Sequence, residues 1–237
     1  SGNTSLPVGI GIFAKGIKKL AVGVSNRLTV INGTKGVVLR DDVIGSATGT
    51  NVSMVNCNIG LNASGNAALG GTETGLDMEG VSGVSIGGAA RNVFAGISSN
   101  AILALNVTNI SILANHIGTA RTGNTSIPVG VGIAAKKARD LIIGMSNQLT
   151  VINGQTAVLL DEVSGSGAGG VGSTMDNCYV GLNALGNAAL AAMTNGVKIE
   201  NSTGFNLGGI ARNVLGGIAS NAVTILNSTN IELSANY

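Results

Sequence analysis

Short apolar segments, separated by glycine and asparagine, recur along the whole 237-residue chain. In several of them apolar and polar side chains alternate, which is typical of a β-strand with one buried face. Windows with the helical period are interrupted by Gly, Asn and β-branched residues, so helices are not expected. The strand signals lie at residues 37–39, 52–55, 75–78, 84–86, 101–105, 110–113, 130–133 and 141–143.

These signals fall into segments of about 26 to 39 residues, each long enough for three short strands and their turns. Regularly spaced short strands with glycine-rich turns are typical of a parallel β-helix, in which each segment forms one coil. We therefore predict an all-β solenoid of this kind. The expected coils are residues 10–35, 36–74, 75–100, 101–130, 131–156, 157–195, 196–221 and an unfinished coil from 222.

A longer repeat encloses these coils. Residues 2–9 (GNTSLPVG) return at 123–130 (GNTSIPVG), an offset of 121 residues, and about half of the paired positions are identical. Four coils make one repeat, which should advance the stack by roughly 19 Å because neighbouring strands lie ~4.8 Å apart. We expect one continuous body over residues 1–237, with a first repeat of 1–121 and an incomplete second repeat of 122–237.

The composition narrows the class of protein. Hydrophobic residues make up 44% and charged residues 10% of the chain, with 38 Gly and 2 Pro, which fits neither a disordered nor a collagen-like sequence. A net charge of +2 does not favour nucleic acid as a partner. No apolar run reaches the ~18 residues of a membrane span, and no signal-peptide pattern opens the chain. Because Ser1 falls in mid-repeat, we expect a processed protein or a piece of a longer chain.

Two strings resemble a known group. NCNIGLNASGNAALGG at 56–71 and IGGAARNVFAGISSN at 86–100, with second copies at 177–192 and 207–221, resemble the bacterial right-handed parallel β-helix repeat proteins of cell surfaces and secretions. ANHIGTARTGN at 114–124 is a further partial match. The resemblance implies a right-handed coil and an extracellular or cell-surface location. It implies no single activity, because such repeats occur in adhesive, structural and carbohydrate-active proteins.

Asparagine recurs at matching coil positions and is expected to form ladders, since it tolerates left-handed backbone and its amide can bond to the next coil. Arg91 and Arg212 also share a coil position, where a guanidinium can satisfy turn carbonyls or bind an anionic sugar. Cys57 and Cys178 lie four predicted coils apart, too far for a disulfide with each other. They are expected in the interior, or else in an intermolecular bridge.

Catalytic chemistry has few candidates. Asp41-Asp42 and Asp161-Glu162 are expected in equivalent turns, Glu79 matches Glu200, and His116, the only histidine, matches Tyr237. No catalytic residue, metal site or cofactor is predicted from these positions. A basic patch returns with each repeat and is either a solubilising face or a grip for acidic polysaccharide. It consists of Lys15, Lys18, Lys19, Lys136, Lys137 and Arg139.

Glycosylation sequons (N-x-S/T) are dense, and the two pairs shared by the copies would place glycans in rows along a rod. The sequons begin at Asn3, Asn32, Asn51, Asn62, Asn106, Asn109, Asn124, Asn201 and Asn227.

Repetition without a unique catalytic cluster favours a structural, extracellular or cell-surface rod whose partner is another copy of itself, in a head-to-tail filament or a longer tandem chain. An enzyme acting on polysaccharide (a lyase, hydrolase or epimerase) and a carbohydrate-binding adhesin module are the alternatives.

Overall fold

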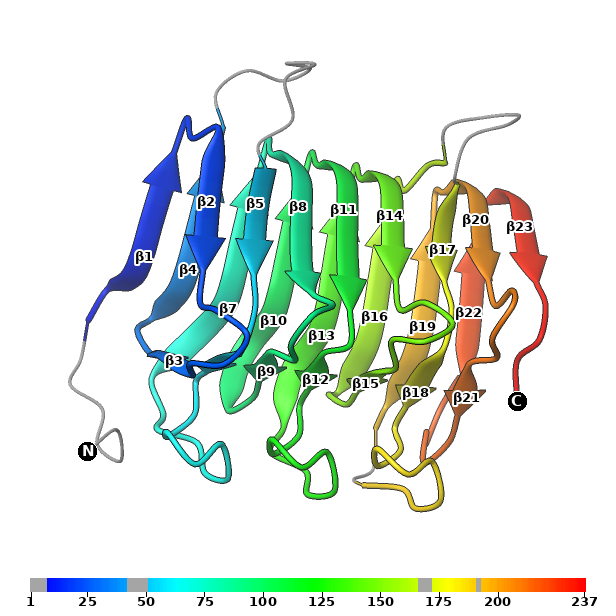
Figure 1. Ribbon diagram of the computed structural model, residues 1–237. Coiled ribbons are helices and arrows are strands. Elements are labelled where there is room, and N and C mark those ends of the chain that lie inside the picture. Colours follow the sequence, from blue (N-terminus) through cyan, green and yellow to red (C-terminus); the bar gives the residue numbers. More distant parts are fainter. Residues whose placement is uncertain (1–7, 42–50, 166–171, 191–192) are drawn as a thin grey trace.

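The computed structural model describes residues 8–41, 51–165, 172–190 and 193–237, which form 23 strands and no helix (Figure 1). The strands belong to three parallel sheets. The first sheet contains β1 (Ile10–Lys15), β4 (Lys35–Arg40), β7 (Thr72–Glu79), β10 (Ile97–Leu105), β13 (Val129–Lys136), β16 (Thr156–Asp161), β19 (Asn195–Glu200) and β22 (Val223–Leu226). The second contains β2 (Lys19–Val22), β5 (Asn51–Met54), β8 (Ser82–Gly87), β11 (Thr108–Leu113), β14 (Arg139–Ile143), β17 (Ser173–Met175), β20 (Thr203–Leu207) and β23 (Thr229–Leu233). The third contains β3 (Thr29–Ile31), β6 (Cys57–Ile59), β9 (Val93–Phe94), β12 (His116–Ile117), β15 (Thr150–Ile152), β18 (Cys178–Val180) and β21 (Val214–Leu215).

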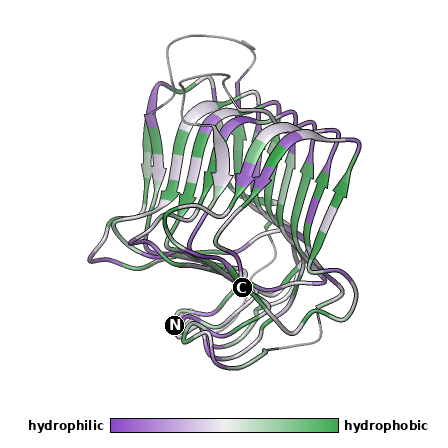
Figure 2. Cartoon of the chain, turned by 90° about the vertical axis from the view of Figure 1, so that its right-hand side faces the viewer, coloured by the Kyte–Doolittle hydropathy of each residue, from purple (hydrophilic) through white to green (hydrophobic). Residues whose placement is uncertain are grey.

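Consecutive strands visit the first, second and third sheet in turn, so the chain is a right-handed parallel β-helix, as predicted. Figure 2, turned by 90° from Figure 1, shows the sheets as walls around a common interior. The register column of Ile10, Lys35, Thr74 and Asn100 in the first sheet agrees with the predicted coil starts to within one residue, while the strands β7 and β10 begin earlier, at Thr72 and Ile97.

The 121-residue repeat is present in the strands themselves. β15 repeats β3 and β18 repeats β6 with the same bounds displaced by 121 residues. Val151 and Ile152 lie in β15, as Val30 and Ile31 lie in β3, so this predicted register is confirmed. Because matching strands stack in one continuous sheet, like side chains form columns along the axis.

The core consists of such columns. In the third sheet, Ile117 pairs with Ile152 and Ile152 pairs with Val180, and all three are fully buried. Burying a side chain of this size contributes ~1.5–3 kcal/mol, and every coil adds several. The aliphatic residues of this sequence therefore suffice to fill the interior with few aromatics.

Left-handed residues mark the turn between the first and second sheets. Among the described residues, the position directly after a first-sheet strand is left-handed in seven turns, and five of these residues are glycine or asparagine. They are Gly16 (φ 61°), Gly80 (φ 70°), Asn106 (φ 52°), Lys137 (φ 53°), Glu162 (φ 56°), Asn201 (φ 48°) and Asn227 (φ 48°). Glycine and asparagine adopt this conformation at the lowest cost, which explains why they punctuate the coils.

An internal asparagine ladder follows the turn into the third sheet. The Asn92 side chain donates to the carbonyl of Met54 (2.7 Å) and to Oδ1 of Asn115 (3.1 Å), and accepts from the backbone of Cys57 (3.0 Å). Asn213 repeats this pattern with Met175, Asn236 and Cys178. The predicted ladders are thus present at these positions.

Both cysteines are free and buried. Burial raises the pKa of Cys57 to about 12, partly offset by the charge of Arg121, and burial also raises the pKa of Cys178. Because a reactive cysteine must be a thiolate, neither thiol is suited to chemistry or to an intermolecular bridge in the folded protein.

Three loops leave the third sheet at alternate coils and stack on one another (Figure 1). They follow β6, β12 and β18, and each contains the string that resembles the bacterial repeat. The backbone of Arg121 donates to the carbonyl of Gly65 (2.7 Å), and that of Ala184 donates to the carbonyl of Gly123 (3.0 Å). The loops therefore form a ridge along the rod.

Candidate functional site

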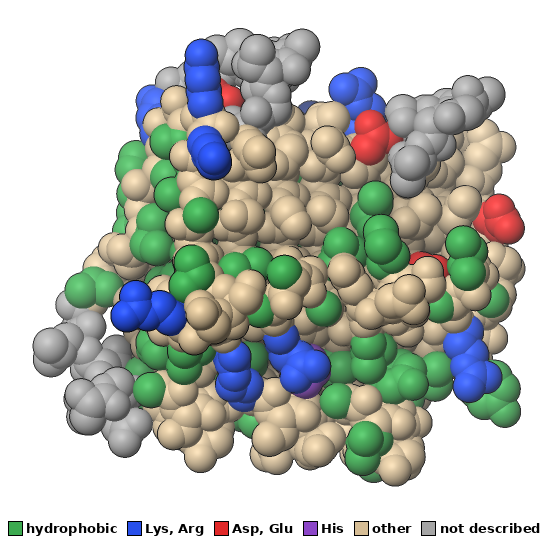
Figure 3. Space-filling view, in the orientation of Figure 1, with side chains coloured by type: hydrophobic (Ala, Val, Ile, Leu, Met, Phe, Trp, Pro, Cys, Tyr) green, Lys and Arg blue, Asp and Glu red, His purple; other side chains and the backbone are tan. Residues whose placement is uncertain are grey.

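The predicted basic patch lies at the edge where the first and second sheets meet. Lys15 and Lys136 end strands of the first sheet, and Lys19 and Arg139 begin strands of the second. Lys and Arg side chains stand along this edge in Figure 3. The six residues form two groups four coils apart rather than one surface.

Carboxylates of the next coil neutralise the second group. Nζ of Lys136 lies 2.6 Å from Oδ2 of Asp161 and 3.4 Å from Oε1 of Glu162, and Lys137 also faces Glu162. The hydrogen bond and charge of Asp161 raise the pKa of Lys136, while hydrogen bonds from Asn201 and Lys136 lower the pKa of Asp161. Asp161 stands opposite Lys136. β16 repeats β4 with the 121-residue offset, so Asp41 and Glu162 occupy equivalent turns, as expected, while Asp161 itself repeats Arg40.

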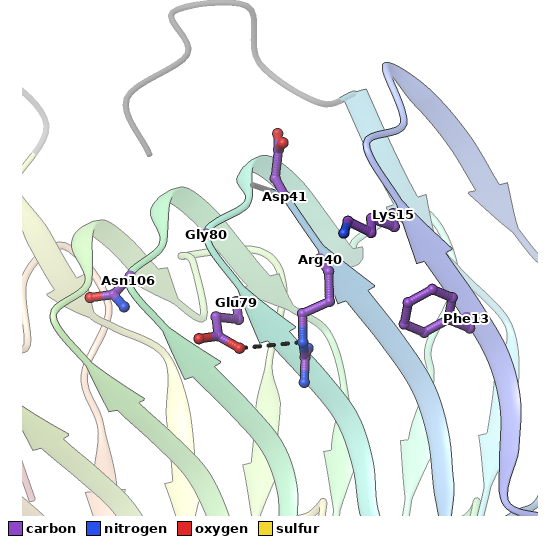
Figure 4. A pocket seen from close by; sticks show the side chains of 7 residues that line it. All are labelled: Phe13, Lys15, Arg40, Asp41, Glu79, Gly80 and Asn106. Atoms are coloured by element: carbon purple, nitrogen blue, oxygen red, sulfur yellow. Dashed lines mark ion pairs between the residues drawn. The ribbon is translucent and has the colours of Figure 1, made fainter. Parts of the chain in front are cut away.

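A shallow pocket lies beside the first group (Figure 4). Its charged lining comprises Lys15, Arg40, Asp41 and Glu79, and Nε of Arg40 lies 3.3 Å from Oε2 of Glu79. Phe13, Gly80 and Asn106 complete it. The pocket thus combines both signs of charge, which does not favour a polyanion.

Asp77 is the most enclosed acid of the first sheet. Its Oδ2 lies 2.6 Å from Nζ of Lys35 and 2.8 Å from Nη2 of Arg40, and its side chain is almost fully buried. Burial alone would raise the pKa of Asp77, but the hydrogen bonds and charges of Arg40 and Lys35 outweigh it and lower that pKa.

We expect Asp77→Asn to cost about 2 kcal/mol of the free energy of unfolding at pH 7, because charge-assisted hydrogen bonds are lost. The folded-state pKa is depressed, so this stabilisation is present above the unfolded pKa of about 3.9 and is lost as the pH falls through the folded value. Denaturant unfolding at pH 7 and pH 3 should show the gap between wild type and variant closing at low pH. The exposed control Glu232→Gln should have the free energy of unfolding of the wild type at both pH values. A difference between wild type and Asp77→Asn that is the same at pH 7 and pH 3 would contradict the assignment.

A second cationic cluster lies on the outer side of the third sheet. Arg121 reaches back from the middle loop, and its Nη1 donates to Oδ1 of Asn58 (2.8 Å) while Nη2 donates to Oδ1 of Asn56. Arg91 precedes β9, and its charge acts on both Arg121 and His116. The sequence singled out Arg91, but not Arg121, whose role depends on the reach of a loop.

His116 is 1% exposed although it lies on the outward side of the third sheet, because the loop that follows it, at Gly123, covers its ring. Burial and the charge of Arg91 lower the pKa of His116 to about 4, so the ring is neutral at pH 7. Its ring nitrogens have no well-aligned hydrogen-bond partner among the described residues; the backbone of Ala120 and Arg121 provides only weaker contacts.

The sequons occupy different environments. Asn106, Asn201 and Asn227 are exposed in turns between the first and second sheets, Asn109 is exposed in β11, and Asn51 and Asn124 are also exposed. The amides of Asn32 and Asn62 are engaged with Leu61 and Asn66. Asn3 lies outside the described residues, as does Asp42. Only the turn asparagines thus form a row along one edge.

Apolar side chains are exposed at both end faces of the stack. Ile225 in β22 is 37% exposed and Leu233 in β23 is 53% exposed, although their strand partners Ile199 and Leu207 are fully buried. At the other end, Ile10 in β1 is 45% exposed. The outer edges of β1, β22 and β23 pair with no strand of the described residues. Leu233 belongs to the column of Ile112, which is fully buried, so its exposure results from its position at the end of the stack.

Comparison of the chain with protein-family models, curated proteins and solved structures finds no match. In the described part of the chain, no group of His, Cys, Asp or Glu has the arrangement of a metal site, and no helix is long and apolar enough to cross a membrane. Three features of the described structure remain as candidate sites. They are the end faces, the basic patch at the edge between the first and second sheets, and the Arg91–Arg121 cluster.

Proposed function

We propose that the chain is a structural rod of a cell surface or extracellular fibre, extended end to end by further copies of its own coils. One observation supports this most: the two end faces are the two sides of a junction that already exists inside the chain. By the 121-residue offset, β22 repeats β10 and β1 repeats β13, and β10 pairs with β13. Likewise β23 repeats β11, β2 repeats β14, and β11 pairs with β14.

The internal junction gives the contacts of the external one. Ile133 lies opposite Ile102 inside the chain, so Ile12 of the next unit would lie opposite Val223. Ile143 lies opposite Ile112, so Val22 of the next unit would lie opposite Leu233. Both pairs are aliphatic. Stacking would satisfy the open strand edges and remove Leu233 and the partly exposed Ile12 and Val223 from water.

The proposed junction joins different faces, so it repeats without closing and produces a filament. The same strand pairing and aliphatic contacts would form the junction whether the next unit belongs to another chain or continues the same chain. Eight coils per chain correspond to an axial advance of roughly 38 Å.

The pocket of Figure 4 supports a second candidate, an enzyme acting on polysaccharide, because it holds Asp41 and Glu79 beside Lys15. Product release from a panel of uronic-acid and neutral polysaccharides, removed by Asp41→Asn or Glu79→Gln, would favour it. The pairing of Glu79 with Arg40 supports the structural proposal instead.

Sedimentation velocity and electron microscopy of residues 1–237 over a range of concentrations test the proposal. We expect concentration-dependent rods of constant width, whose lengths are multiples of roughly 38 Å. A species that remains monomeric at every concentration up to about 1 mM would overturn end-to-end association, since that corresponds to a binding free energy weaker than about −4 kcal/mol.

A further inference from the structure

Arg91 and Arg121 form a cluster of two positive charges on the outer side of the third sheet. The cluster spans three neighbouring coils. Asn58, Val93 and His116 are consecutive partners in the third sheet. Arg121 starts in the loop beyond His116 and spans to Asn58, so it crosses the coil that carries Arg91. The two guanidinium groups therefore lie on the same outer surface, beside the ridge of loops.

No carboxylate compensates this pair. In the residues that the structure describes, neither arginine forms an ion pair, and Arg91 donates no side-chain hydrogen bond. The oxygens that hold Arg121 belong to the neutral amides of Asn56 and Asn58. The guanidinium fork of arginine fits an oxyanion, and such a charge-assisted pair is stronger than a hydrogen bond to a neutral amide.

The second repeat shows that the lack of compensation is specific to this position. There Asp176 replaces Val55, and its Oδ2 accepts a hydrogen bond from the backbone of Ala211, next to Arg212. Arg212 itself lies over the ring of Tyr237, 5.7 Å from its centre. The first repeat has Val55 in place of that acid, so an external anion can take its place beside Arg91 and Arg121.

We propose that Arg91 and Arg121 bind an oxyanion, a carboxylate or sulfate group such as an acidic polysaccharide carries. Arg91 is exposed and has its donors free, whereas Arg121 is oriented by the two asparagines. One oxyanion would accept from both guanidinium groups and relieve their mutual repulsion. This site is independent of end-to-end assembly, because it lies on the side of the rod.

His116 is a built-in reporter of such binding, since it is the only histidine and the charges of Arg91 and Arg121 contribute to its depressed pKa. The probes are sodium sulfate and a uronic-acid oligosaccharide, each added to the full chain at constant ionic strength maintained with chloride. We expect the NMR titration midpoint of His116 to move to higher pH and to saturate with ligand, because a bound anion offsets the nearby positive charge.

Arg91→Ala should weaken binding at least tenfold, and Arg212→Ala, the matched position 121 residues on, should not change it. The melting temperature of Arg91→Ala should equal that of the wild type, since Arg91 supports no described contact. Tighter binding of the uronic-acid probe would assign the source as acidic polysaccharide, and equal binding would assign a general oxyanion site. The proposal would be overturned if the shift of the His116 midpoint did not saturate with ligand, or if it were equal in Arg91→Ala and Arg212→Ala. Either result would indicate charge screening only.

Discussion

The Ile152→Asp variant is expected to lose on the order of 4 kcal/mol of its free energy of unfolding. Ile152 is fully buried in β15, with Ile117 on one side and Val180 on the other. An aspartate there would be an unpaired charge enclosed by aliphatic side chains, among the costliest single substitutions. Chemical denaturation followed by circular dichroism measures the loss.

Two controls separate burial from charge. Ile210→Asp places the same charge at a side chain that is 94% exposed and should change stability by less than about 0.5 kcal/mol. Ile31→Asp, the same position in the first repeat, should cost less than Ile152→Asp, because β3 has a described neighbour only on the side of β6. Equal stability of Ile152→Asp and the wild type would refute the stacking register.

The Leu233→Asp variant is expected to fold normally and yet to lose end-to-end association. In the single chain this side chain is half-exposed, so an aspartate reaches water at little cost. In the proposed junction it would be buried against Val22 of the next unit, which should weaken association at least 100-fold, about 3 kcal/mol. Sedimentation velocity and the melting temperature measure the two effects separately.

Ile112→Asp is the matched comparison, because Ile112 occupies the same column 121 residues earlier and is fully buried. It should destabilise the fold itself, whereas Leu233→Asp should not. Ile210→Asp again carries the charge without touching a proposed contact. Association of Leu233→Asp with wild-type strength would show that the end faces do not meet in this register.

The coils were predictable because each signal was local. Alternation predicted β8 and β11, and glycine or asparagine at the turns marked the coils, although β7 and β10 begin three and four residues before the predicted coil starts. The offset of 121 residues placed the same strands in the second repeat. Such patterns suffice for the fold because every coil repeats the same backbone requirements.

The chemistry of the surface was not predictable in the same way, because it depends on contacts between coils. Lys136 read as part of a basic patch, but the register places Asp161 directly beside it. His116 gave no signal of burial, since the loop that follows it covers its ring. Arg121 reaches across one intervening coil to Asn58, a contact between residues separated by 63 positions in the sequence.

Helical reconstruction of filaments formed by residues 1–237 tests the central claim most directly. We expect an axial rise of roughly 38 Å per chain, continuous parallel sheets, and β22 of one chain paired with β1 of the next in the register of β10 with β13. Chains that pack side by side, or that meet through two like ends, would contradict it.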